Sequence, residues 1–107
     1  MWRAYMRTYD RNGNDPYIGR RLVALMHAAG AEPVRNTWIF FGSCAGSGDW
    51  STVIDNCRGI LVGGKVEITR HIGAREFDAG IAEFDAWSKR PDASYWLPLA
   101  WAEGRRA

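Results

Sequence analysis

A chain of 107 residues is long enough for one modest hydrophobic core, and we expect residues 1–107 to form a single domain. The formal net charge of +2 is spread among acidic side chains, which argues against a nucleic-acid-binding surface. No apolar run reaches the length of a membrane span and no signal peptide is recognisable, so we expect a cytoplasmic protein without membrane contact. Cys44 and Cys57 are then expected to be free thiols, and no metal-ligand spacing is present.

The first predicted element is a short amphipathic helix with an aromatic face. Trp2, Tyr5, Met6 and Tyr9 recur at the spacing of one helix face. The sequence Asn12-Gly13-Asn14 ends this helix, because glycine and asparagine tolerate positive φ.

A helix from Asp15 to Gly30 is predicted next. Asp15 suits the N-cap, Pro16 the first helical position, and Gly30 a left-handed C-cap. The strand expected over Pro33–Gly42 is rich in β-branched and aromatic residues. Its stretch Trp38–Phe41 is apolar on both sides, so we expect cover on both faces of this strand.

The second half of the chain begins with a glycine-rich connector. Gly42–Gly48 lacks the lysine and the spacing of a P-loop and is interpreted as a flexible link. The helix predicted over Trp50–Leu61 has Asp49 as its cap. Gly63-Gly64 weakens it and leaves at most a frayed continuation.

The last two predicted elements are a helix and a strand. The helix covers Ala74–Arg90 and ends before Pro91. The strand covers Tyr95–Glu103, where Pro98 favours a position at the edge of a sheet. The expected fold class is therefore α+β, with about four helices around a short antiparallel pair of strands near residues 33–42 and 95–103.

Several stretches together resemble one protein family. Asp15–Leu22 (Asp-Pro-Tyr-Ile-Gly-Arg-Arg-Leu), then Ala28-Ala29-Gly30 and a strand, resemble the DPxxGRRLxxLLxxAG stretch of class I S-adenosylmethionine-dependent methyltransferases that act on small molecules. The rest of that family's C-terminal part is resembled by four further stretches: Trp50–Leu61, Phe77–Gly80, Arg90–Ala93 and Trp101–Arg105. The resemblance covers essentially the whole chain. It implies a Rossmann-like fragment with strands six and seven and a helical insertion that commonly helps to enclose the methyl acceptor.

The same resemblance implies that the cofactor-binding N-terminal half is absent. In the family that half supplies the first strand–helix turn with its glycine fingerprint, and an acidic residue after the second strand. We therefore expect a stand-alone, non-enzymatic, self-associating domain without a cofactor. Two alternatives stay open: a small-molecule binding module with an aromatic pocket, or the acceptor-binding part of a methyltransferase completed by another chain. Only in the last case would the protein be an enzyme, with another chain supplying the S-adenosylmethionine site.

A small-molecule pocket is expected between the first helix and the helix that begins at Trp50, because aromatic walls with one polar contact suit such a site. The residues predicted to line it are Trp2, Tyr5, Tyr9, Trp38, Trp50 and Arg7, with Arg3 as an alternative to Arg7. Trp38 and Trp50 also fit a hydrophobic core, so both roles stay open.

The resemblance also implies an incomplete sheet. It puts the Tyr95–Glu103 strand between strand six and strand five, and the chain supplies only strand six. An unpaired strand edge is a template for another chain, and a two-stranded sheet is marginal alone. We therefore predict a homodimer joined through the strands that buries Trp96, Leu97 and Trp101.

Overall fold

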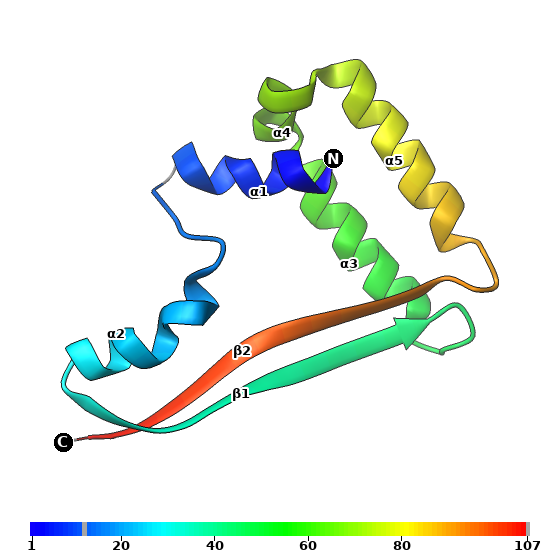
Figure 1. Ribbon diagram of the computed structural model, residues 1–107. Coiled ribbons are helices and arrows are strands. Elements are labelled where there is room, and N and C mark those ends of the chain that lie inside the picture. Colours follow the sequence, from blue (N-terminus) through cyan, green and yellow to red (C-terminus); the bar gives the residue numbers. More distant parts are fainter. Residues whose placement is uncertain (12, 107) are drawn as a thin grey trace. The chain divides into compact units, whose positions relative to one another are not determined.

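The computed structural model describes residues 1–11 and 13–106. Its elements, in chain order, are α1 (Trp2–Arg11), the 3₁₀ helix η1 (Ile18–Arg21), α2 (Leu22–Ala28), β1 (Ala31–Cys44), α3 (Trp50–Gly63), α4 (Lys65–Ile72), α5 (Ala74–Ser88) and β2 (Ser94–Arg106) (Figure 1). β1 and β2 pair as a two-stranded antiparallel sheet. The fold class is α+β, as predicted, with five α-helices in the described part of the chain where the sequence suggested about four.

Residue contacts divide the chain into two units. The helical unit comprises Met1–Asn14 and Ser43–Tyr95 and contains α1, α3, α4 and α5. The sheet unit comprises Asp15–Gly42 and Trp96–Ala107 and contains η1, α2 and most of both strands. The single-domain expectation stays a prediction.

α4 is the central element of the helical unit, because it contacts α1, α3 and α5. Its Ile68 is fully buried beside Leu61 of α3 and Phe77 of α5, and Ala4 of α1 joins the same cluster. Burial of each large side chain stabilises the fold by about 1.5–3 kcal/mol. The sequence predicts only a frayed turn after Gly64. The prediction is wrong because burial of Ile68 supports a complete helix at this place.

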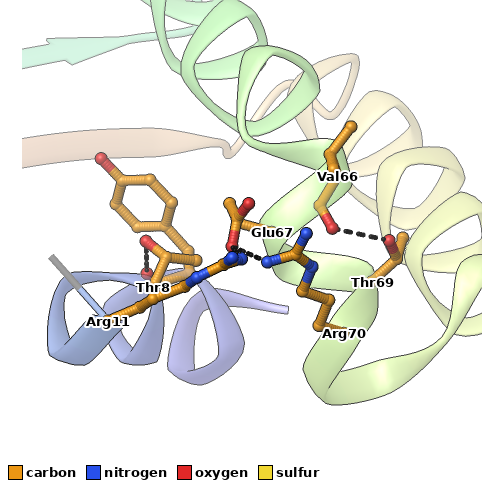
Figure 2. Close-up of polar contacts among 7 residues, drawn as sticks. Thr8, Arg11, Val66, Glu67, Thr69 and Arg70 are labelled. Carbon is orange, nitrogen blue, oxygen red and sulfur yellow. Dashed lines mark hydrogen bonds and ion pairs between the residues drawn. The ribbon is translucent and has the colours of Figure 1, made fainter.

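One carboxylate joins α1 to α4 at the surface, as Figure 2 shows. Glu67 Oε2 accepts a hydrogen bond from Arg11 Nη1 at 2.8 Å and another from Arg70 Nη1 at 2.9 Å. The first bond ties two helices together, whereas the second lies within α4. All three side chains are partly exposed, so solvent and salt screen this network.

A Glu67→Gln substitution is expected to destabilise the protein by about 0.5–1 kcal/mol at low ionic strength, because it removes the charge from two exposed ion pairs. The loss should shrink in 1 M salt, where the Debye length is about 3 Å. Urea unfolding at both ionic strengths measures it. Glu83→Gln is the matched control and should change neither midpoint, because Glu83 lies beyond the first turn of α5 and makes no ion pair within residues 1–11 and 13–106. An equal loss in both salts would contradict the electrostatic assignment.

In the sheet unit, η1 and α2 pack on one face of β2. A Cβ atom on Gly19 would lie 2.7 Å from Ala100 Cβ, so the glycine permits a close approach of η1 to the strand. Gly104 likewise leaves room for the side chain of Met26 on α2. Because side chains alternate along a strand, Ala100 and Gly104 share their face with Trp96. η1 and α2 therefore cover part of the Trp96 face.

The single helix predicted from Asp15 to Gly30 is wrong. The Asp15 carboxylate accepts a hydrogen bond from the Tyr17 backbone N–H at 2.8 Å, two residues on. The backbone bonds that follow are of the i→i+3 type, from the Ile18 N–H to the Asp15 carbonyl and from the Arg20 N–H to the Tyr17 carbonyl, so the segment divides into η1 and α2. Gly30 does adopt a left-handed φ of 82° after α2, as a glycine at this place should.

The cover predicted for both faces of Trp38–Phe41 is not found among residues 1–11 and 13–106. Trp38 is 55% exposed, Phe40 61% and Phe41 56%. A two-stranded sheet has few side chains to set against these rings, and η1 and α2 leave each ring more than half exposed. The sheet unit therefore presents a large apolar surface.

Candidate functional site

Trp2, Tyr5 and Tyr9 form a row of aromatic rings along α1, as their spacing predicts. The rings meet edge to face, with centroid separations of 6.0 Å and 5.8 Å. The hydroxyl oxygens of Tyr5 and Tyr9 are 3.1 Å apart, and this hydrogen bond, with burial, raises the pKa of Tyr5 to about 12. The hydroxyl groups of Tyr5 and Tyr9 are thus hydrogen-bonded to each other. Of the three residues in this row, Trp2 lines the aromatic hollow that is described below.

Trp50 connects α3 to α5. Its indole Nε1 donates a hydrogen bond to the backbone carbonyl of Ser88 at 2.9 Å. Its ring meets Trp87 of α5 edge on, with centroids 5.7 Å apart, and Trp87 in turn meets Phe84 at 5.6 Å. Trp50 therefore acts as a packing residue that fixes the position of Trp87.

The aromatic hollow of the helical unit has a volume of about 400 Å³. Seven residues line it, from Met1 and the start of α1, from α5 and from the start of β2: Met1, Trp2, Gly80, Glu83, Phe84, Trp87 and Tyr95. Tyr95 is half-buried, and burial together with a hydrogen bond to the Cys57 thiol raises its pKa. The walls are therefore mostly aromatic, and Glu83 is the charged side chain at the hollow.

Sequence reasoning missed the α5 side of this hollow. Phe84 and Trp87 continue an apolar helical stripe that also contains the buried Phe77, and such a stripe usually indicates a core. The sequence feature that could have indicated a hollow is Gly80. It lies one helical turn before Phe84, on the same face of α5, and has no side chain to fill the space there. A Cβ atom there would lie 3.2 Å from Met1 Sδ, so the glycine leaves space at this point.

The other predicted pocket residues lie elsewhere. Trp38 belongs to the sheet unit, where it lines a separate hollow of about 530 Å³ with Tyr17, Arg20 and other residues of η1 and β2. The Arg20 guanidinium lies 4.9 Å from the Tyr17 ring centroid in this unit. Arg7 is exposed on α1. The structure thus brings only Trp2 of the predicted set to the aromatic hollow.

The residues predicted to form a dimer interface are exposed on paired strands. Trp96 is 66% exposed, Leu97 40% and Trp101 46%. Trp96 meets Phe40 of β1 with ring centroids 6.0 Å apart. Since side chains alternate, Leu97 and Trp101 lie on the opposite face from Trp96. One flat contact cannot bury all three residues.

The polar end of the Leu97 face is well ordered by hydrogen bonds. Glu103 Oε1 accepts from Trp101 Nε1 at 2.8 Å and from Arg35 of β1 at 3.2 Å. These bonds hold the Trp101 ring along the strand. They leave its apolar surface free for a contact.

The connector between β1 and α3 has its own local hydrogen bonds. Asp49 stands before α3, but its carboxylate accepts from Ser43 Oγ at 2.7 Å rather than capping the helix as predicted. Cys44 is exposed, and the Ser47 hydroxyl and the Gly46 backbone N–H lower the pKa of its thiol. Cys57 is buried and, like Cys44, is a free thiol, as predicted.

Within the described residues, no three His, Cys, Asp or Glu side chains lie where they could hold a metal ion. None of the described helices combines the length and apolar character needed to cross a membrane. No protein-family model matches the chain, and no curated protein or solved structure shows significant similarity to it.

Proposed function

We propose that this chain is a non-enzymatic association domain, similar to the C-terminal part of a class I methyltransferase, and that a second copy of the chain covers its sheet. The observation that carries the proposal is the exposure of large apolar side chains on a two-stranded sheet. On the Leu97 face, Leu97, Leu99 and Trp101 are each at least 40% exposed, and on the opposite face Phe40 and Trp96 are each at least 61% exposed. Contiguous apolar patches of this kind mark association surfaces, and a sheet of two strands is marginal by itself.

The Leu97 face suits a two-fold contact better than the Trp96 face. η1 and α2 already occupy part of the Trp96 face, through Gly19 and the side chain of Met26. The Leu97 face also carries Leu99 and Trp101, and the Glu103 network forms a polar rim at its end. An apolar centre with a polar rim is the usual composition of a protein interface.

Analytical ultracentrifugation of the purified chain at micromolar concentration tests the proposal. A dimer with twice the 12.1 kDa chain mass is expected. A single species at the chain mass over the whole concentration range would contradict it, because the apolar faces would then have to be covered within one chain.

The chain alone is expected not to bind S-adenosylmethionine. The family's glycine fingerprint is absent, and the glycine-rich connector leads into α3 with a carboxylate, Asp49, at the helix N-terminus. Isothermal titration calorimetry measures this directly. Stoichiometric micromolar binding would contradict the assignment as non-enzymatic and favour a methyltransferase.

A second candidate function is small-molecule binding in the helical unit. The aromatic hollow of about 400 Å³ favours it, since apolar walls with one polar group are typical of ligand sites. The third possibility, an acceptor-binding part completed by another chain, predicts that an added cofactor-binding chain forms a stable complex. Native mass spectrometry of the protein isolated from its source distinguishes such a complex from the homodimer.

A further inference from the structure

We infer that the aromatic hollow of the helical unit binds a small organic cation, such as a substituted ammonium ion. This inference rests on the second candidate function and is independent of the dimer. The hollow combines the aromatic side chains of Trp2, Phe84, Trp87 and Tyr95 with one carboxylate, Glu83. Aromatic faces attract cations through the negative potential of their π-systems, and a carboxylate supplies the opposite charge.

Helix geometry puts the carboxylate and two rings on the same side of α5. Glu83, Phe84 and Trp87 follow Gly80 at three, four and seven residues, which is one face of an α-helix. Glu83 makes no ion pair within residues 1–11 and 13–106, whereas Asp78 and Asp85 of the same helix are paired with Lys65 and Arg58. Its charge is therefore available to a ligand.

Two of the lining rings contact aromatic side chains that lie outside the lining. Trp50 meets Trp87 and is itself held by its hydrogen bond to the Ser88 carbonyl. Trp2 meets Tyr5, whose hydroxyl is bonded to Tyr9. Walls that are already ordered lose little conformational entropy when a ligand binds.

The hollow is large enough for a small molecule, and the carboxylate in its lining favours a positively charged ligand. Glu83 is the only charged side chain among the seven described residues that line the hollow, so an anionic ligand would meet a side chain of like charge. A neutral apolar ligand would contact the rings but leave the carboxylate unused. We therefore expect the charge of the ligand to decide affinity.

Choline and 3,3-dimethylbutan-1-ol test this, because they have the same shape and differ in having nitrogen or carbon at the branched centre. Titration is followed by ¹H–¹⁵N NMR of the indole N–H groups. Choline should shift the Trp2 and Trp87 signals, with an affinity about tenfold or more above that of the alcohol. Equal affinities, or choline shifts confined to other tryptophans, would overturn the inference.

A charge-removing variant separates the carboxylate from the rings. Glu83→Gln should weaken choline binding about fivefold or more and leave the alcohol unaffected. Glu76→Gln, on the same helix but outside the hollow, is the matched control and should bind choline normally. The indole spectrum without ligand verifies that each variant is folded.

Unchanged choline affinity in Glu83→Gln would contradict the role proposed for the Glu83 carboxylate. Absence of binding by either compound would reject both this inference and the second candidate function, whereas the sedimentation experiment tests the dimer separately.

Discussion

A Leu97→Lys variant is expected to sediment as a monomer of 12.1 kDa at concentrations where the unmodified chain is a dimer. Leu97 lies on the strand face that we propose as the centre of the two-fold contact and is 40% exposed in the single chain. The substitution replaces an apolar contact by a charge that the second copy would have to desolvate. We expect dimer affinity to fall about 100-fold or more, which sedimentation equilibrium measures directly.

Two further variants make this test specific. Val66→Lys introduces the same charge at an apolar residue of α4 that is 69% exposed, and should leave the dimer intact. Trp96→Lys changes the opposite strand face. If it dissociates the dimer while Leu97→Lys does not, the second copy covers the Trp96 face and our choice of face is wrong.

The sequence predicts best those elements whose patterns are determined locally. The helix predicted over Trp50–Leu61 occurs as Trp50–Gly63, and the strand predicted over Pro33–Gly42 occurs as Ala31–Cys44. Amphipathic spacing and β-branched composition are properties of neighbouring residues, so they can be recognised without tertiary information.

The segment after Asp15 shows where such reasoning fails. Asp15 makes a side-chain hydrogen bond of the kind that an N-cap makes, to the Tyr17 N–H two positions on, yet the chain continues as a turn and the 3₁₀ helix η1. One α-helix, and a turn followed by a 3₁₀ helix, can both begin with such a residue, so the sequence alone does not distinguish them. The close approach of Gly19 to Ala100, far along the chain, is consistent with the tighter η1 conformation and cannot be inferred locally.

The candidate site depends still more on tertiary structure. The aromatic residues of α1 are visible in the sequence, and Trp2 does reach the hollow. Phe84 and Trp87, which line the hollow from α5, cannot be distinguished in the sequence from core residues. An apolar stripe along a helix does not reveal which other helix will pack against it. α4 contacts both α1 and α5 and so determines which residues of these two helices come together. The sequence predicts only a frayed continuation where α4 forms.

The two proposals concern different parts of the chain. The association surface belongs to the sheet unit, and the aromatic hollow belongs to the helical unit. A substitution that dissociates the dimer should therefore leave the indole shifts caused by choline unchanged. Loss of both properties in Leu97→Lys would instead indicate that the strands and the hollow are coupled.

A Leu61→Ala substitution is expected to destabilise the helical unit by about 2–5 kcal/mol, because it removes a large side chain from a closed cluster. Leu61 is fully buried and shares its cluster with Ala4, Ile68 and Phe77. Small domains are stable by only about 5–15 kcal/mol, so this loss is large. Urea unfolding followed by helical circular dichroism measures it, at one fixed protein concentration because dimer formation adds to the apparent stability.

Its neighbour Ile60 provides the control. Ile60→Ala also shortens an aliphatic side chain on α3, but Ile60 is 43% exposed where Leu61 is fully buried. Its substitution should cost less than about 1 kcal/mol, since little apolar area is lost from the core. Equal shifts of the urea midpoint would mean that the two side chains are equally buried in solution. That result would contradict the buried cluster that Leu61 of α3 forms with Ile68 of α4 and Phe77 of α5.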